Sequence, residues 1–539
     1  MDSNIIEKLS NIAMTNDPID QSLYEKFDVK RGLRYADGRG VLVGLTSIGD
    51  AIGYEIDKDN KKIAIPGRLI YRGYNVEDIV KDVEKSHQFG YEQVAYLLLF
   101  GQLPTKNQLE EFKELLGSLR ALPEYFTEDM IMKAPSSDIM NKIARGVLAS
   151  YSYDKDPENR DIKNILRQCI ELTSRFSTLA AYGYQAKRRY YDGKSMYVHY
   201  PKPELGTAEN FLRLIRSNKT YTPLEAELLD LSLILHAEHG GGNNSSFTIH
   251  VVSSADTDTY SAVAAAVGSL KGSRHGGANI RVMEMMDDIK KNVKDWSNEN
   301  EIREYLLKIG RKEAFDHTGL IYGQGHGVYT ISDPRAILLR NKAEELARAK
   351  DCLEEFHLYN IIERLAPDVL CELHGDKKRI CTNVDFYSGF VYSMLGIPRE
   401  LYTPLFAISR IAGWSAHRIE EIVAGRRIYR PAYKGIADLR EYVPMENRVE
   451  NAIPQVKREE NAVVTVSARK CRYFGNIDAV SYLVIRTLRE FNRLTDIRPA
   501  AVRGIDGNRV FAFFFVCVHS EYFRIVSNRI CGFKRPVRF

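Results

Sequence analysis

The sequence predicts a mostly α-helical protein with one small region of β-structure near its N-terminus. In most long segments the apolar residues recur at the three- and four-residue spacing of a helix face. Strand signals are concentrated in residues 41–73, where β-branched runs flank the polar stretch DKDNKK at 57–62. This arrangement is typical of a short hairpin or meander.

A helix is expected over residues 223–235, because its start and its end both carry recognisable signals. Thr222 can cap the helix, a proline follows at the first helical position, and Glu225 stands three residues after the cap. Glycines that follow His239 end the helix. His236 and His239 are therefore expected in its last turn or just beyond it.

Two further helices are expected near other histidine and arginine residues. The Ala-rich segment 259–272 (TYSAVAAAVGSLKG) reads as a helix that ends immediately before His275. Thr403, followed by proline, opens or caps an apolar helical stretch that continues through Ile411.

The basic charge of the chain belongs to its C-terminal segment. The 539 residues carry 76 basic and 71 acidic side chains, and residues 449–539 hold 16 of the basic but only 8 of the acidic ones. The preceding part is therefore weakly acidic. Length alone suggests two to four domains or sub-domains, with a boundary near residue 448.

The segment 449–539 has three interpretations. It can be an appended module, a poorly ordered extension, or sequence that was never selected to fold. Its basic residues are interspersed with aromatic ones, which resembles a nucleic-acid-binding surface. No recognised RNA- or DNA-binding signature is present, and we expect no nucleic-acid partner.

The cysteines and the apolar runs indicate a cytoplasmic protein. The seven cysteines are odd in number and form no CxxC pair, which favours a reducing compartment and gives no zinc-ribbon pattern. The N-terminal segment has no basic-then-apolar targeting pattern. The run VFAFFFVCV is far shorter than the roughly 20 residues that span a bilayer, so no membrane association is expected.

Six motifs between His236 and Arg430 carry the chemistry of the chain. Imidazoles can donate or move protons near neutral pH, carboxylates can act as bases, and arginines bind carboxylates through paired hydrogen bonds. Together these groups suit carbon-acid chemistry on a small polyanionic substrate. In order, the motifs are HAEHGGGNN, SRHGGAN, GQGHGVYTISDPR, TNVDFYSG, FAISR and IYRPAYKG.

The first motif has a rival interpretation as a metal site. His236 and His239 are three residues apart, so on one helix they could ligate zinc. A helix end whose polar side chains bond nearby carbonyls is the commoner arrangement. His275 and His326 are more specific, since each is flanked by glycines that let the backbone approach a ligand closely.

The order and spacing of these motifs resemble the citrate synthase family, in particular its bacterial citrate and 2-methylcitrate synthase branch. The resemblance extends from about residue 30 to Arg448 (30–448). It implies a two-domain helical fold and the condensation of acetyl-CoA with oxaloacetate and water to give citrate and CoA, a reaction of the tricarboxylic acid cycle. It implies no metal and no tightly bound cofactor, with acetyl-CoA as co-substrate.

The resemblance also implies a role for each catalytic residue. Asp385 would be the base that removes a methyl proton from acetyl-CoA. A thioester methyl is a weak acid, so the enolate oxygen needs a positioned donor, and the family places His275 there. His326 would bond the ketone oxygen of oxaloacetate and protonate the alkoxide that forms.

The remaining roles concern binding. Arg335, Arg410 and His239 would bind the oxaloacetate carboxylates. In the family the arginine of the RP motif, here Arg430, reaches the site from the partner subunit, which implies a homodimer. Two asparagines, Asn243 and Asn279, are expected to organise the loops of the site.

Coenzyme A is expected to meet basic side chains shortly before Asp385. The candidates are Lys377, Lys378 and Arg379, although a solvated charge run is an equally good interpretation of each. Many family members carry an arginine where this chain has Thr330. That contact must be absent or supplied by another residue.

The implied domain arrangement is discontinuous. Residues 1–277 and 389–448 would form a large helical domain, 278–388 a small domain, and 449–539 a C-terminal extension. Closure of the small domain over oxaloacetate would assemble the site and exclude water. Three alternatives stay open: 2-methylcitrate synthesis from propionyl-CoA, a metalloenzyme using the histidine pair of the first motif, and a catalytically silent binding protein.

Overall fold

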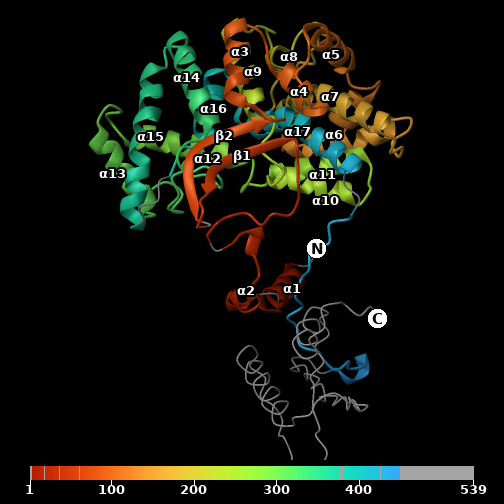
Figure 1. Ribbon diagram of the computed structural model, residues 1–539, viewed down its shortest axis with the longest axis vertical. Coiled ribbons are helices and arrows are strands. Elements are labelled where there is room, and N and C mark those ends of the chain that lie inside the picture. The colour runs from red at the N-terminus through yellow and green to blue at the C-terminus, as the bar shows by residue number, and fades with distance from the viewer. Residues whose placement is uncertain are drawn as a thin grey trace, which may run out of the picture. The chain divides into compact units, whose positions relative to one another are not determined.

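The computed structural model describes most of the chain up to Arg448. One compact unit extends from Met1 to Ala432, and a second begins at Tyr433 (Figure 1). The predicted extension 449–539 lies outside the described residues. The described ranges are 3–16, 19–35, 37–59, 61–375, 380–424 and 427–448.

The β-structure is a small antiparallel sheet, in the region that the sequence predicted. Its strands are β1 (Gly49–Ile56), β2 (Lys62–Tyr71) and β3 (Tyr74–Asn75), in the order β1-β2-β3. At the β1–β2 turn, Asp57 accepts hydrogen bonds from the backbone amides of residues 59 and 61 at 2.9 and 2.7 Å. This side chain replaces ladder bonds and closes the hairpin.

Most of the rest of the described chain is helical, which confirms the predicted fold class. Short helical turns lie at η1 (Arg31–Leu33), η2 (Thr127–Met132), η3 (Tyr151–Tyr153), η4 (Arg399–Leu401) and η5 (Met445–Asn447). The α-helices are α1 (Ser3–Asn16), α2 (Ser22–Lys26), α3 (Val76–Ser86), α4 (Tyr91–Phe100), α5 (Lys106–Leu119), α6 (Ile139–Ser150), α7 (Ile162–Tyr190), α8 (Thr207–Ile215), α9 (Pro223–His236), α10 (Asn244–Ser254), α11 (Thr259–Lys271), α12 (Ala278–Asn292), α13 (Glu299–Gly310), α14 (Pro334–Ala349), α15 (Leu353–His374), α16 (Val384–Met394) and α17 (Tyr402–Ala424).

The predicted helix ends agree with the structure at α9 and α11. Thr222 and Glu225 form the expected capping box at the start of α9. The helix ends at His236, so His239 lies three residues beyond it, as predicted. Helix α11 ends at Lys271, just before the loop that carries His275.

Helix α17 is longer than the apolar pattern indicated, and it is the most buried helix of the site region. Every residue from Tyr402 to Arg418 is buried. The pattern stops at Ile411 because Ser415, His417 and Arg418 are polar yet buried. In Figure 1, α17 lies between α13–α15 on one side and α5–α7 on the other. A helix buried on all faces belongs to the core rather than to the surface.

The helices α12 to α16 pack on one another within the first unit. Helix α16 contacts α12 and α14, and α15 contacts α13 and α14. Contacts of α14 and α16 with α9, and of α12 with α17, join them to the other helices. The predicted division at residues 278–388 stays a prediction. None of the described helices has the length and apolar character needed to span a bilayer.

Glycine at position 413 allows α17 to lie directly against the segment after α9. A Cβ atom at Gly413 would lie 2.4 Å from the carbonyl oxygen of Ala237 and 2.5 Å from a carboxylate oxygen of Glu238. We expect Gly413→Ala to lower the free energy of unfolding by about 1–3 kcal/mol, the usual cost of overpacking. Gly40→Ala is the control, because nothing lies within 4 Å of its Cβ position. Urea denaturation that gives equal stabilities for the two variants would contradict the close approach.

Candidate active site

One face of α17 forms the base of the site. Phe406, Arg410 and Trp414 recur every four residues, so they share a face. The ring of His236 stacks on Phe406 with centroids 3.6 Å apart. Arg410 Nε donates to the carbonyl oxygen of His236 at 2.6 Å, and Trp414 Nε1 donates to Ser245 Oγ at 3.1 Å. These contacts hold the end of α9 and the segment after it against this face of α17.

His239 and Arg410 present buried polar atoms that no described residue bonds. Among the described residues, Arg410 Nη1 and His239 Nε2 have no hydrogen-bond partner. Arg410 is only 1% exposed. Burial, together with the nearby Arg335, holds the pKa of His239 well below its usual value, so the ring is neutral. Buried polar atoms without a protein partner indicate a binding site for a polar ligand.

His326 is held in one tautomer by the backbone. Its Nδ1 accepts hydrogen bonds from the amides of Val328 and Tyr329 at 3.0 and 3.1 Å. The neutral ring must then carry its proton on Nε2. Burial, with a contribution from Arg335, lowers the pKa of His326 to about 4. Gly325 precedes the ring with φ of 89°, in the left-handed region that favours glycine.

Arg335 directs a second donor to the same place. Its Nη2 lies 3.4 Å from His326 Nε2. Since both atoms carry hydrogens, they suit one acceptor oxygen that both can reach. Asp333 holds the guanidinium through contacts of 3.0 Å to Nε and 2.7 Å to Nη2. Burial would lower the pKa of Arg335, but the adjacent Asp333 raises it above its usual value, so the group stays charged.

His275 is connected to α17 through Ser245. Its Nε2 lies 3.1 Å from Ser245 Oγ, the same oxygen that accepts the indole hydrogen of Trp414. That hydroxyl also lies 2.9 Å from Asn243 Oδ1, so its single hydrogen has two possible acceptors. Burial, with a smaller effect of Arg410, lowers the pKa of His275 to about 4. The ring is neutral at physiological pH.

Asp385 stands in the first turn of α16. Asn383 caps that helix by accepting the Asp385 amide hydrogen at 3.1 Å. Asp333 Oδ2 accepts from the amide of Val384 at 3.2 Å, so one carboxylate connects the starts of α14 and α16. Burial raises the pKa of Asp385 to about 6, although Arg335 and Arg410 act in the opposite direction. No described residue donates a hydrogen bond to its side-chain carboxylate.

The structure brings together most of the predicted site residues. The rings of His239 and His326 are 5.1 Å apart, centroid to centroid, and Arg335 contacts His326. Arg430 is different, since its side chain is exposed whereas Arg335 and Arg410 are buried. The three predicted CoA-binding residues, Lys377, Lys378 and Arg379, lie outside the described residues.

The metal interpretation of the first motif finds no support in the geometry. His236 Nε2 bonds the hydroxyl of Tyr392 at 2.9 Å, and its ring is stacked on Phe406. Among the described residues, the histidines and acids that do converge are His250, His417 and Glu420. That group contains neither member of the His236 and His239 pair.

Several residues of the site were missed at the sequence level. Asp333 precedes a proline at a helix start, a pattern that indicates an N-cap, yet it also binds Arg335 and the amide before Asp385. Trp414 stands one helical turn after Arg410, which was a usable signal. Ser245 gave none, because only the fold places it beside both Trp414 and His275.

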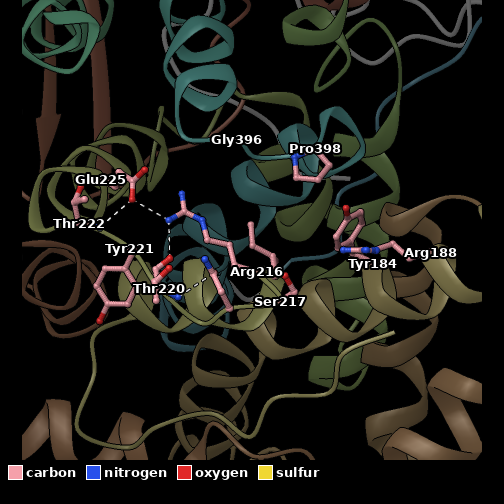
Figure 2. A pocket seen from close by; sticks show the side chains of 12 residues that line it. Tyr184, Arg188, Arg216, Ser217, Thr220, Tyr221, Thr222, Glu225, Gly396 and Pro398 are labelled. Carbon is pink, nitrogen blue, oxygen red and sulfur yellow. Dashed lines mark hydrogen bonds and ion pairs between the residues drawn. The ribbon is translucent and has the colours of Figure 1, made fainter. Parts of the chain in front are cut away.

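A separate cavity lies away from these residues. It has a volume of about 510 Å³ and opens beside the C-terminal end of α7 and the segment after α8 (Figure 2). Within it, Arg216 Nη1 donates to Glu225 Oε2 and to the carbonyl oxygen of Thr220, both at 2.8 Å. None of the predicted site residues lines this cavity, so it is distinct from the candidate active site.

Comparisons with known proteins agree with this site. Residues 35–432 match the family described as citrate synthase, C-terminal domain. A citrate synthase of Haloferax volcanii is 35% identical over 427 residues, covering 78% of this chain and 99% of that protein. A 2-methylcitrate synthase of Shewanella oneidensis is 33% identical, covering 70% and 92%. A citrate synthase of Thermoplasma acidophilum, solved in a ternary complex with carboxymethyl coenzyme A and oxaloacetate, has a TM-score of 0.61 at 27% identity, covering 78% and 99%.

The fold and the site define an α-helical acyltransferase. Its described helices, its small antiparallel sheet and the relatives that it matches over most of their length agree on this class. The chain belongs to the citrate synthase family, as the sequence motifs predicted. It is an enzyme that condenses acetyl-CoA with oxaloacetate and water to give citrate and CoA.

The neutral histidines have a measurable consequence. Because the folded pKa of His275 and of His326 is about 4, below the unfolded value of about 6.5, the unfolded chain binds more protons between these two pH values. Each histidine should therefore lower the free energy of unfolding by about 1.4 kcal/mol per pH unit as the pH falls from 6.5 towards 4.

Ring nitrogen NMR shifts should show His326 as the Nε2–H tautomer at pH 6. An imidazolium signal from His326 at that pH would contradict the assignment.

Proposed function

We propose that Asp385 is the catalytic base of the condensation. It would remove a methyl proton from acetyl-CoA, leaving an enolate whose oxygen needs a hydrogen-bond donor. A carboxyl with a pKa of about 6 is ionised at neutral pH yet more basic than an ordinary aspartate. The absence of hydrogen bonds to its carboxylate from described residues leaves both oxygens available for the substrate.

His275 would donate to the enolate oxygen as a neutral imidazole. Asn243 Oδ1 accepts the Ser245 hydroxyl hydrogen at 2.9 Å, so this hydrogen would turn to His275 Nε2 when the ring carries its own hydrogen on Nδ1. The indole hydrogen of Trp414 occupies a lone pair of the same hydroxyl oxygen in both arrangements. A preorganised neutral donor stabilises developing negative charge without being deprotonated in the ground state.

His326 and Arg335 would activate the ketone of oxaloacetate. Their hydrogens converge on one position, where a carbonyl oxygen would accept both. When the enolate carbon attacks the ketone carbon, the carbonyl electron pair moves to that oxygen, and His326 Nε2 supplies the proton. Water would then carry the proton held by Asp385 back to the ring, so that both groups regain their starting charge. Water then hydrolyses the thioester to release citrate and CoA.

Carboxylate binding would involve His239, Arg335, Arg410 and Arg430. Arg410 Nη1 and His239 Nε2 are both buried and both lack a hydrogen-bond partner among the described residues, and this observation carries the proposal most directly. Arg430 is exposed. We propose that it completes the site of a partner subunit, so that the active form is a homodimer.

Coenzyme A would be held by Lys377, Lys378 and Arg379. These residues precede Asp385 in the sequence, and their positive charges suit the phosphates of CoA. Acetyl-CoA would act as a co-substrate, and the reaction would use no metal and no tightly bound cofactor. Thr330 would leave one family CoA contact to these or other basic residues.

Domain closure and cellular location complete the proposal. Residues 278–388 would move against 1–277 and 389–448, since Asp385 and His275 lie near the two crossovers. We place the enzyme in the cytoplasm, in the tricarboxylic acid cycle. Among the described residues, the free thiols of Cys169, Cys352 and Cys381 support a reducing compartment.

Propionyl-CoA is a second candidate substrate, because a 2-methylcitrate synthase is among the relatives. Propionyl-CoA differs from acetyl-CoA by one methylene, which is worth about 1–3 kcal/mol of discrimination in a pocket. The ratio of kcat/KM for the two thioesters decides between them. A ratio that favours propionyl-CoA would make methylcitrate the principal product.

The base assignment predicts a specific kinetic change. Asp385→Asn should lower kcat by roughly 10²–10⁴-fold, the usual contribution of a general base, while oxaloacetate binding stays within a few-fold. In the wild type, kcat/KM for acetyl-CoA should fall about tenfold per pH unit below pH 6, since only the ionised carboxylate is active. A variant that loses oxaloacetate affinity but keeps its kcat at saturation would disprove the role.

The shared site predicts complementation between two inactive variants. Arg430→Ala and Asp385→Asn homodimers should each have little activity. When the two variants are mixed under conditions that exchange subunits, some dimers contain one site with both native residues. Citrate formation should rise to roughly a quarter of the wild-type rate. If mixing restores nothing although mass spectrometry shows exchanged dimers, Arg430 acts within its own chain or not at all.

A further inference from the structure

A buried chain of four ionisable side chains leads from the active site towards the end of α17. His417 Nε2 forms an ion-pair contact of 3.1 Å with Glu238 Oε1. Its Nδ1 lies 3.0 Å from His250 Nε2, and His250 Nδ1 lies 2.8 Å from Glu421 Oε2. All four side chains are buried, with exposures between 0% and 8%. The proposed mechanism uses none of them.

The contacts leave the shared proton on either ring, and the pKa directions favour His417, because the pKa of His250 is lowered by burial and by His417. His417 faces a carboxylate on one nitrogen and the ring of His250 on the other. If His417 carries both hydrogens, His250 accepts at Nε2 and donates from Nδ1 to Glu421. Burial opposes a charged His417, but the pairing with Glu238 prevails and raises its pKa to about 9. In return, His417 holds the pKa of the buried Glu238 below its usual value.

Glu238 has little room to move. A Cβ atom at Gly49 would lie 2.6 Å from Glu238 Cγ, and one at Gly413 would lie 2.5 Å from its carboxylate oxygen. The side chain is thus confined between β1 and α17. Tyr71 Oη donates to the carbonyl oxygen of Glu238 at 3.1 Å. Residue 238 is therefore fixed through its backbone and its side chain, immediately before His239.

The same carboxylate acts on Arg410 without occupying it. Glu238 is the strongest charge that favours the charged form of Arg410 against burial. No ion pair joins the two groups, and Arg410 Nη1 has no partner among the described residues. Glu238 can therefore compensate a buried charge while leaving its donor available for a ligand.

We propose that Glu238, His417, His250 and Glu421 form a positioning relay that fixes His239 and Arg410 for binding a carboxylate of oxaloacetate. His417 is the central positioning residue of this relay. It acts through Glu238 and touches no substrate. The inference rests on the proposed function for the identity of the ligand, although the relay itself is defined by its own contacts.

A metal site is the alternative for part of this cluster. Glu420 Oε2 lies 3.8 Å from His417 Nδ1, so His250, His417 and Glu420 could surround a cation. Glu420 Oε1, however, already accepts from the amide and the hydroxyl of Ser47 at 2.7 and 2.8 Å. A metal ion would have to displace the proton that the rings of His417 and His250 share. The contacts therefore favour the relay.

The test compares His417→Gln with His199→Gln. His199 is a partly buried histidine whose Nε2 contacts the carbonyl oxygen of Arg216, outside both the relay and the site. Calorimetry should show that His417→Gln weakens oxaloacetate binding roughly 10- to 100-fold, the effect of small displacements of binding groups. Its kcat at saturating oxaloacetate should stay within about threefold of the wild-type value, because displaced carboxylate-binding groups weaken the ground state and the transition state about equally. His199→Gln should match the wild type in both measurements.

The pH dependence gives a readout that a purely structural role would not change. Wild-type oxaloacetate binding should weaken as the pH rises through about 9, where His417 loses its proton, and His417→Gln should lack this transition. The charged or titratable groups around the ring are Glu238, His250, Glu420 and Glu421, with Arg72 and Arg410 beyond them.

Several results would overturn the relay. They are unchanged oxaloacetate affinity in His417→Gln, a kcat that falls as far as the affinity does, or stoichiometric zinc in the purified wild type. If His417→Gln does not fold, oxaloacetate binding is measured instead in Glu421→Gln and as a function of pH in the wild type. Wild-type binding that shows no transition near pH 9 contradicts the relay. Binding is measured without turnover. A wild type that binds oxaloacetate but makes no citrate would therefore refute the proposed function and leave the relay standing.

Discussion

The buried charge of Arg410 is the constraint around which the site is arranged. A guanidinium inside a core is costly unless nearby groups compensate it, and this one lies on a helix that is buried on all faces. The carbonyl oxygen of His236 accepts one of its hydrogens, and Glu238 opposes its charge. The segment after α9 must therefore lie against α17, and this contact sets the positions of His239 and, through Ser245 and Trp414, of His275.

Burial assigns opposite charge states to the acids and the histidines of the site. Removing a group from water disfavours its charged form, so the pKa of Asp385 rises while those of His275 and His326 fall. At neutral pH the base is ionised and both histidines are uncharged donors. Positive charge for a polyanionic substrate is left to the arginines, whose protonation survives burial. The histidines thus donate without charge, and the arginines donate with it.

Local signals in the sequence were sufficient for the elements but not for the contacts between them. The capping box of α9, the hairpin within 41–73 and the glycines around His326 depend on neighbouring residues, and all were readable. The second half of α17 was not, because its buried polar residues interrupt the apolar pattern that identifies a core helix. Their partners are distant in the sequence: His250 and Glu421 are 171 residues apart. Such a pairing exists only after the fold has formed.

The turn that begins at His326 has an implication for how this sequence can vary. The two groups that fix the tautomer of His326 are the main-chain amides of Val328 and Tyr329, and every residue except proline supplies an amide hydrogen. As far as proton placement is concerned, positions 328 and 329 are therefore free to change in size and polarity. The path of the backbone alone places the two amides that donate to His326 Nδ1. The tautomer of this histidine can therefore stay the same in relatives whose side chains in the turn differ.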